Sequence, residues 1–413
     1  MRLFLLLFLL MMPACVLAQS VSVPFTVDAA VSEAIRNNPR LSAAAHDVKS
    51  ARQAERSASA LANPQIIFAP SLTGEGSDTE ALIQQPLELN GTRAARTDAA
   101  RARLRGTIAD MATTLRDLVF DTKNAYYELA RAREQLALAQ DLLQSFQDFD
   151  RMTRQQVELG SRPAVEQTQS GIEVIRARQQ VTLAQSQGNR ALAALNAVMG
   201  RDPIQPIDTL APLPLAFAAE HRNTALRQAL SARTDIISAD AAAEAFRQDA
   251  RQARAEGLPD LAPQYRATTI THGVHNAGFG IALTLPLLDY GSRRGRVRQN
   301  EEAAHAQSDR ATAVRTQVRK EVEQALFQTQ AADAVLTDYP QGLLSQVQSL
   351  LDASRLGYQE GRTSVLALLD AQRTYRAVQG EYINAQVNAA LARVELERAM
   401  GAVPAAALME KMR

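Results

Sequence analysis

The feature that most constrains the fold of this 413-residue chain is an internal repeat. Three segments recur in the same order, offset by 200 or 201 residues: 85–93 at 285–293, 159–162 at 360–363, and 197–200 at 398–401. Both copies of the first segment contain Pro-Leu-x-x-x-Gly-x-Arg. A repeat of this length indicates a chain built from two similar halves. Each half is predicted to contain strands, a long helix, a turn and a second helix.

The first residues are predicted to be a secretory signal peptide. Arg2 precedes an unbroken apolar run over residues 3–12, which is shorter than the ~20 residues that span a bilayer. Small or modest side chains follow up to Ala18, before a plausible cleavage point at Gln19. We therefore expect residues 1–18 to be removed and the mature protein to leave the cytoplasm.

The single cysteine, Cys15, lies inside this segment and has two interpretations. It is either an apolar residue that is lost on cleavage, or the acceptor of a lipid anchor, because residues 12–15 loosely match the bacterial lipoprotein box. With either interpretation the mature chain forms no disulfide of its own, so its stability must come from packing or assembly.

Charge and motifs exclude several classes of function. Lys and Arg total 45 against 44 Asp and Glu, so no global basic field favours nucleic acid. The chain lacks a phosphate-binding glycine loop, a nucleophile elbow and a cysteine cluster, so no enzyme activity, cofactor or metal ligand set is predicted. His272 and His275 form either a weak metal-contacting site or an ordinary exposed loop.

A helix of unusual length is predicted over residues 92–157. A strict 3.5-residue repeat of apolar side chains, broken only by Thr122, indicates a coiled-coil seam. Such a helix would be roughly 100 Å long at 1.5 Å per residue. The seam is Leu104, Ile108, Met111, Leu115, Leu118, Thr122, Ala125, Leu129, Ala132, Leu136, Ala139, Leu143 and Phe146; its copy is Val318, Val322, Ala325, Thr329, Ala332, Leu336, Tyr339 and Leu343.

Shorter elements complete each half. Helices are expected over 28–62 and 224–256, from Pro163 to Met199, and from a cap at Thr363 or Ser364 to Met400. Pro340 predicts a kink near Tyr339 in the second long helix. Strands are expected at 65–72, 79–87, 262–271 and 278–287, joined by hairpin turns at 74–77 and 272–276.

These elements divide the chain into a leader, two repeats, a connector and a tail. The first repeat covers residues 19–201 and the second covers 222–402. A proline-rich connector over 202–221 joins them, and 403–413 form the tail. The predicted fold class is mainly α with a small β part. No second apolar run is long enough for a membrane helix, so any part of the chain that spans a membrane must consist of strands.

The motifs together resemble the TolC family of outer-membrane efflux channels. The resemblance rests on residues 38–41, the junctions at 86–93 and 286–293, the turns at Gly160 and Gly361, and residues 368–372. Residues 85–91 look most similar to the CzcC-type branch, which serves heavy-metal exporters. The resemblance implies a homotrimer in which each chain contributes four strands to a twelve-stranded outer-membrane β-barrel, continuous with a coiled-coil helical barrel through the periplasm. It also implies a periplasmic adaptor and an inner-membrane pump, of RND type, as partners.

The resemblance implies functional residues at the periplasmic tip. Asp370 matches an aspartate that narrows the entrance of relatives, and Ala367 replaces its companion aspartate. Glu166 and Tyr358 match an interhelix gate network. Thr363 stands at the position of the family's arginine, so Arg362 beside it is assigned to the gate. The adaptor-docking turns comprise Gly160, Ser161, Arg162, Gly361, Arg362 and Thr363. The residues alone favour another interpretation, in which Asp370 and Glu166 are solvated carboxylates on helix surfaces near a turn.

Three functions are compatible with these observations. The leading hypothesis is a passive exit duct of a tripartite efflux system, serving heavy-metal cations. A duct for drug efflux or type I protein secretion has the same fold. A periplasmic coiled-coil adaptor belongs to another class, and two full-length helical hairpins with paired strands between them argue against it.

Overall fold

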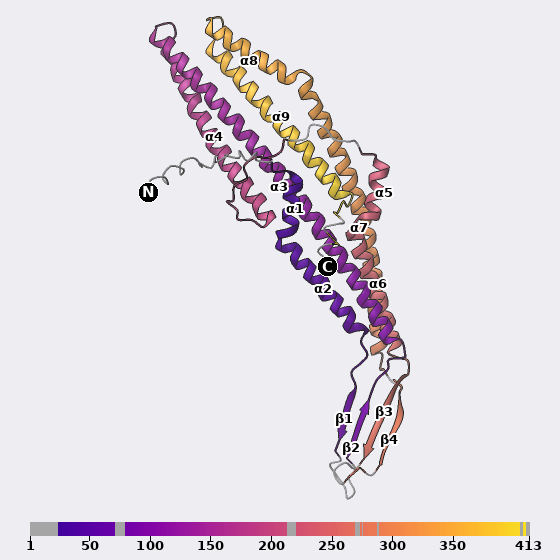
Figure 1. Cartoon of the computed structure of the whole chain (residues 1–413). Coiled ribbons are helices and arrows are strands. Elements are labelled where there is room, and N and C mark those ends of the chain that lie inside the picture. Colours follow the sequence, from indigo (N-terminus) through magenta and orange to yellow (C-terminus); the bar gives the residue numbers. More distant parts are fainter. Residues whose placement is uncertain are drawn as a thin grey trace, which may run out of the picture.

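Two long helical hairpins extend from one four-stranded sheet, so the molecule is an elongated rod with strands at one end and helical turns at the other (Figure 1). The computed structural model describes residues 24–70, 79–212, 220–268, 273–274, 276–286, 289–404 and 408–409. The leader with Cys15, the turn at 74–77 and the histidines at 272 and 275 lie outside these residues. The mainly helical fold with a small antiparallel sheet is confirmed.

The sheet joins the two halves of the chain. Its order is β1 (Gln65–Ala69), β2 (Glu80–Gln84), β3 (Asp260–Thr268) and β4 (Asn276–Thr284), all antiparallel. β1 and β2 are shorter than predicted, and β3 and β4 begin two residues earlier than predicted. The central pairing of β2 with β3 brings Glu80 opposite Thr268. β1 and β4 each keep one unpaired edge among the described residues.

The helices before each pair of strands are broken where single helices were predicted. α1 (Val27–Asn37) ends before α2 (Pro39–Ser59), because proline disfavours helical backbone in the residue before it. Asn38 is the N-cap of α2, because its side chain accepts a hydrogen bond from the Arg40 amide at 2.8 Å. In the second half, α5 (Arg222–Ala232) and α6 (Thr234–Ala255) are separated by Arg233. The predictions of continuous helices over 28–62 and 224–256 were therefore wrong.

The first long helix is continuous and ends one residue from its predicted end. α3 (Thr92–Glu158) contains 67 residues, which correspond to roughly 100 Å at 1.5 Å per residue. All thirteen predicted seam positions are buried or half-buried. α4 (Ala164–Met199) returns beside it. Pro163 is the N-cap of α4 and not its first helical residue, a shift of one position from the prediction.

The second long helix is interrupted at the predicted place. α7 (Ser292–Asp338) passes through a π-helical turn, η2 (Tyr339–Leu343), into α8 (Leu344–Gln359). Gly342 adopts φ of 154° there, a conformation that favours glycine. The seam of α7 is buried or half-buried as far as Leu336 and reaches the surface at Leu343. α9 (Val365–Ala399) then returns along α7 and α8, and Ser364 caps it by accepting from the Ala367 amide.

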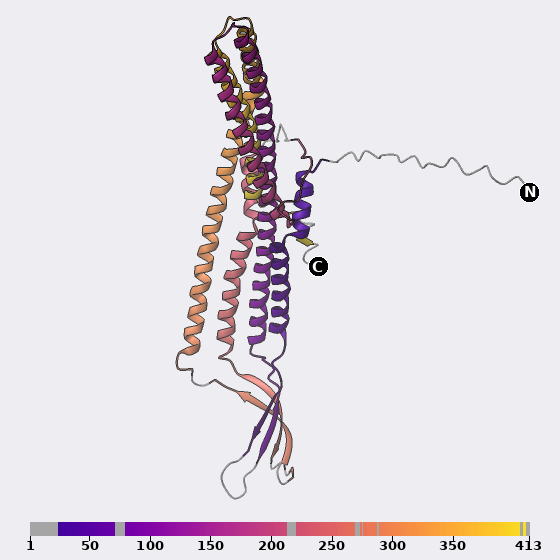
Figure 2. The same ribbon diagram turned by 90° about the vertical axis from the view of Figure 1, so that its left-hand side faces the viewer.

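Near the sheet, α2, α3, α6 and α7 stand side by side, each packed on the next (Figure 2). Farther along, α1, α2, α3, α4 and α9 enclose the largest apolar core, which includes Leu41, Met111, Leu115 and Leu195. None of the helices in the described part of the chain is both long and apolar enough to cross a membrane.

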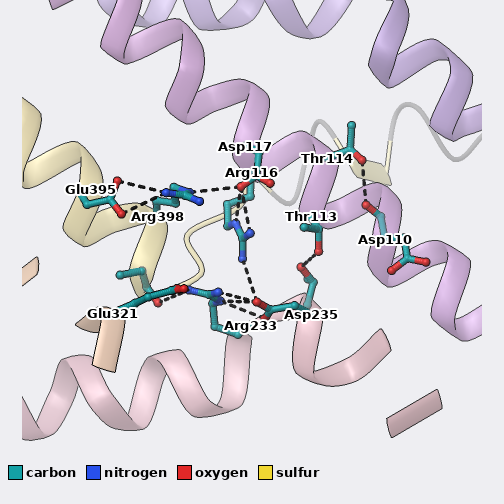
Figure 3. Close-up of polar contacts among 12 residues, drawn as sticks. Asp110, Thr113, Thr114, Arg116, Asp117, Arg233, Asp235, Glu321, Glu395 and Arg398 are labelled. Atoms are coloured by element: carbon teal, nitrogen blue, oxygen red, sulfur yellow. Dashed lines mark hydrogen bonds and ion pairs between the residues drawn. The ribbon is translucent and has the colours of Figure 1, made fainter. Parts of the chain in front are cut away.

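A buried ion cluster holds the helices together at the middle of the rod (Figure 3). Arg233, at the break between α5 and α6, donates to Glu321 Oε2 of α7 at 2.8 Å and to the Ala399 carbonyl at the end of α9 at 3.2 Å. It also donates to both carboxylate oxygens of Asp235. Burial would raise the pKa of Asp235, but the hydrogen bonds and charge of Arg233, aided by Arg116, outweigh it and lower that pKa. The cluster therefore connects α3, α6, α7 and α9.

Candidate functional site at the helical tip

Two tight turns lie at the end of the rod that is farthest from the sheet (Figure 1). Gly160 reverses the chain between α3 and α4 with φ of 70°, and Gly361 does the same between α8 and α9 with φ of 75°. Their amides donate to the carbonyls of Val157 at 2.9 Å and Tyr358 at 3.1 Å. A side chain at either glycine would be strained by this left-handed backbone, although a Cβ would meet no atom closer than 3.9 Å.

The two hairpins pack against each other just behind these turns. Tyr358, near the end of α8, is fully buried, and its ring meets Phe149 of α3 edge-on with 5.2 Å between centroids. Buried apolar side chains from α3, α4, α8 and α9 surround this pair; they include Phe146, Ala177, Leu351, Val365, Leu368, Leu369 and Ala371. The tip is therefore a small core of its own, shared by both halves of the repeat.

A polar clasp lies within this core and connects the two hairpins. The Tyr358 hydroxyl donates to Glu166 Oε2 of α4 at 2.9 Å. Arg162 Nη2 donates to the Tyr358 carbonyl at 2.9 Å, and its guanidinium lies 4.5 Å from the centroid of the Tyr358 ring. Arg162 Nη1 is 3.8 Å from Glu166 Oε1. Burial raises the pKa of the Tyr358 hydroxyl, and the neighbouring Glu166 adds to the effect, so Tyr358 keeps its proton at neutral pH.

The arginine of this clasp differs from the predicted one. The structure brings Glu166 and Tyr358 together as the resemblance implies, but Arg362 does not join them. Arg362 pairs with Glu360, and its side chain is 69% exposed. Arg162 occupies the clasp instead, with only 17% of its side chain exposed. The four-residue spacing of Arg162 and Glu166 at the start of α4 was the sequence signal that could have identified this pair.

The remaining turn residues divide into internal and exposed positions. The Thr363 amide donates to the Gly357 carbonyl at 3.0 Å, which fastens the end of α8. The Thr363 hydroxyl contacts the Ser354 carbonyl at 3.4 Å. Ser161 and Arg362 are exposed. Of the residues predicted to dock a partner, these last two and the glycines therefore form the outer surface of the tip.

Asp370 lies in the second turn of α9 and is exposed. Its carboxylate has no ion pair or hydrogen bond among the described residues, while nearby Arg373 donates to Glu173 of α4 at 2.9 Å. A carboxylate in this state keeps its full charge available to ions or to another copy of the chain. Its assignment to an entrance constriction stays a prediction. Within the described ranges, His, Cys, Asp and Glu form no group of three or more that could hold a metal ion.

Comparison with known proteins agrees with this architecture. A family profile described as "Outer membrane efflux protein" matches residues 30–201 and 225–402. The chain is 25% identical over 397 residues to the cobalt-zinc-cadmium resistance protein CzcC of Cupriavidus metallidurans, covering 92% of this chain and 90% of that protein. It is 26% identical over 255 residues to the pyoverdine export outer membrane protein OpmQ of Pseudomonas aeruginosa, covering 59% of this chain and 52% of that protein.

Solved structures share the fold across nearly the whole chain. CusC superposes with a TM-score of 0.78 at 21% identity, covering 92% of each chain. VceC of Vibrio cholerae also gives a TM-score of 0.78, at 20% identity, covering 91% of this chain and 96% of that one. At these sequence identities, the superpositions show a shared fold only.

Proposed function

Because this chain belongs to the outer membrane efflux protein family, we propose that it is the passive exit duct of a tripartite efflux system for heavy-metal cations. In this proposal the four strands lie in the outer membrane and the helices cross the periplasm. The observation that carries the substrate class is the similarity to CzcC, which extends over 92% of this chain and 90% of that protein.

The unpaired edges of the sheet support a homotrimer. A four-stranded sheet with free edges on β1 and β4 is open to pairing with other copies, and a closed ring of strands removes such edges. Several large apolar side chains of the sheet are exposed, as expected for a surface that meets lipid. They include Ile66, Phe68, Phe279, Ile281 and Leu283. Three chains would close one barrel of twelve strands.

Exposed apolar side chains on the helices support the same assembly. They follow α4 on one hairpin and α7 with α8 on the other. A head-to-tail interface between two different faces closes into a ring when the rotation is 120°. We assign these two faces to the contacts between neighbouring copies. Their members are Val165, Ile172, Ile175 and Leu183 on α4, and Phe327, Val335, Leu350 and Leu356 on α7 and α8.

At the tip, the turns at Gly160 and Gly361 are assigned to docking of a periplasmic adaptor, which in turn joins an inner-membrane pump of the RND type. Asp370 is assigned to the entrance. Three unpaired carboxylates around a narrow opening raise the local concentration of cations, as rings of acidic side chains do in cation channels. The clasp of Arg162, Glu166 and Tyr358 is assigned to holding the two hairpins of each chain in the closed arrangement.

A deletion strain tests the proposed substrate. Loss of the gene should lower tolerance to cobalt, zinc and cadmium salts, and the wild-type chain should restore it. A Gly361→Leu chain should reach the membrane without restoring tolerance. Unchanged tolerance to all three metals in the deletion strain would contradict the metal assignment.

A duct for organic cargo is the second candidate, and the similarity to OpmQ over 59% of this chain favours it. The same strains separate the two candidates. Restored export of an organic compound, with metal tolerance unchanged, would favour the second.

A further inference from the structure

The junction between sheet and helix is more basic in the second repeat than in the first. α3 and α7 both follow a glycine in the left-handed conformation, Gly91 at φ 90° and Gly291 at φ 88°, so residues 200 apart occupy equivalent helical positions. The positions of Ala94 and Asp98 in α3 are taken in α7 by Arg294 and Arg298. The two repeats therefore share the fold at this junction, but the second repeat carries more positive charge at two positions one helical turn apart.

These two arginines line a pocket of about 420 Å³ between the end of α6 and the start of α7. Arg254 and Arg293 also line it, and Glu301 is its single acidic side chain. Its remaining lining is small or apolar: Gly257, Leu258 and Val297. Four guanidinium groups against one carboxylate leave the pocket with a net positive charge.

Local partners neutralise only part of this charge. Arg254 pairs with Glu301, and Arg293 Nε lies 3.4 Å from Asp289 Oδ2. Among the described residues, neither Arg294 nor Arg298 has a carboxylate oxygen within 4.0 Å of its guanidinium. Their spacing of four residues directs both to one side of α7.

Both repeats have a paired arginine at this level of the rod. In the first repeat Arg96 holds Glu88 through two hydrogen bonds, at 2.7 and 3.1 Å, and also donates to the Ala58 carbonyl at 2.9 Å. Its equivalent in the second repeat, Arg296, pairs with Glu256 at 2.8 Å. A guanidinium with this set of partners has a structural role. Arg294 and Arg298 have no ion pair of this kind among the described residues, and only the more distant charge of Asp289 acts on Arg294.

Gly257 makes room for one of the guanidinium groups that line the pocket. A Cβ at this position would overlap the guanidinium of Arg293. The absence of a side chain at Gly257 therefore lets Arg293 lie directly against the backbone at the end of α6. Arg293, Arg294 and Arg298 all line the pocket beside this stretch of backbone.

The pocket lies at the boundary between apolar and charged surface. β4, which ends eight residues before α7 begins, exposes Phe279 by 91%, Ile281 by 72% and Leu283 by 55%. If the strands lie in the membrane, as the proposed function requires, the pocket is at the depth of the phospholipid headgroups. Arginine is suited to phosphate because its planar fork donates two parallel hydrogen bonds.

We propose that the pocket between α6 and α7 binds the phosphate of an anionic glycerophospholipid in the leaflet that faces the periplasm. Arg294 and Arg298 contact the phosphate, while Leu258 and Val297 contact the apolar part of the lipid next to it. Basic pockets at the headgroup level bind anionic lipids in other membrane proteins. This inference rests on the proposed membrane location of the strands.

The test is a lipid titration of the purified full-length protein in neutral detergent, read by native mass spectrometry. Phosphatidylglycerol should bind more tightly than phosphatidylcholine. The double variant Arg294→Gln/Arg298→Gln should weaken phosphatidylglycerol binding by about 25-fold, since each basic side chain near an anionic surface contributes about fivefold. The matched control is Arg310→Gln/Arg319→Gln, which removes the same charge from the same helix at least ~18 Å farther along and should bind like wild type.

Several outcomes overturn the inference. Equal binding of phosphatidylglycerol by wild type and the Arg294→Gln/Arg298→Gln variant would do so, as would equal loss in the control. Competition by inorganic phosphate at the lipid's own concentration would mean a free-anion site. Loss of oligomers with unchanged lipid binding would mean that the arginines pair with a neighbouring copy. Membrane fractionation separates these failures from failure of the proposed function, because only the latter predicts absence of the protein from the outer membrane.

Discussion

Tyr358→Phe removes the hydrogen bond from the hydroxyl to Glu166, together with its longer 3.5 Å contact with the Thr153 hydroxyl of α3, and leaves the packing of the ring in place. The hydroxyl donates to Glu166 Oε2 at 2.9 Å, while the ring keeps its contact with Phe149. Tyr358 is fully buried and the Glu166 side chain is 13% exposed, so water competes weakly for either group. The variant therefore isolates the polar part of the clasp.

The size of the effect follows from this burial. Hydrogen bonds to charged groups contribute about 1.5–3 kcal/mol. If the bond is lost when the hairpins separate, its removal should lower the ratio of closed to open arrangements by about 10- to 150-fold in each chain. Because three chains contribute in the proposed trimer, even the lower value should change the behaviour of the whole channel.

Single-channel recording of purified protein in planar bilayers measures this directly. Tyr358→Phe should raise the open probability at neutral pH. Tyr375→Phe is the control, because Tyr375 packs half-buried against the same apolar cluster and its hydroxyl has no hydrogen bond among the described residues. An open probability equal to wild type in Tyr358→Phe, or an equal rise in Tyr375→Phe, would refute the assignment of the clasp to closure.

Four further predictions concern the tip and the buried ion cluster. In Gly361→Leu, a leucine would have to adopt φ of 75°, which is strained for any residue with a side chain. The variant should abolish efflux in an export assay and leave the oligomer mass unchanged in native mass spectrometry. Asp370→Asn should lower cation selectivity and multivalent-cation block in single-channel recordings at low salt, and the difference should shrink as salt rises. Arg233→Met should lower the free energy of unfolding by about 3 kcal/mol, because it leaves Asp235 without its main partner. The pKa of Asp235 is lowered in the folded state, so its charge stabilises the fold above pH 3.8. This stabilisation is lost as the pH falls through the lower folded-state pKa. The free energies of unfolding of wild type and Asp235→Asn, measured by denaturation, should therefore become equal in acid.

The sequence predicts the long elements well because their signals are local. α3 was predicted within one residue because a regular seam runs through a segment with no proline and with Gly106 as its only glycine. The kink after α7 was predicted because Pro340 cannot continue a regular helix. The break at Asn38 also has a local signal, because Pro39 disfavours helical backbone in the residue before it.

The errors arose where tertiary contacts decide the conformation. No proline or glycine marks the break at Arg233, which is buried among ion partners from α6 and α7. The clasp arginine was assigned to Arg362 from its place beside the second turn. The fold instead brings the first turn next to Tyr358, so Arg162 supplies the guanidinium. The contact of this arginine with Tyr358 joins residues roughly 200 positions apart, although the four-residue spacing of Arg162 and Glu166 is a local signal for their pairing.

The central claim is that the open sheet of this chain becomes one closed channel in the outer membrane by assembly of three copies. The most direct measurement is the native mass of the full-length protein extracted from outer membranes in detergent, with the conductance of the same sample recorded in planar bilayers. We expect a mass three times that of one chain and a conducting species that disappears when the oligomer is dissociated. A stable monomer that still conducts would contradict the claim.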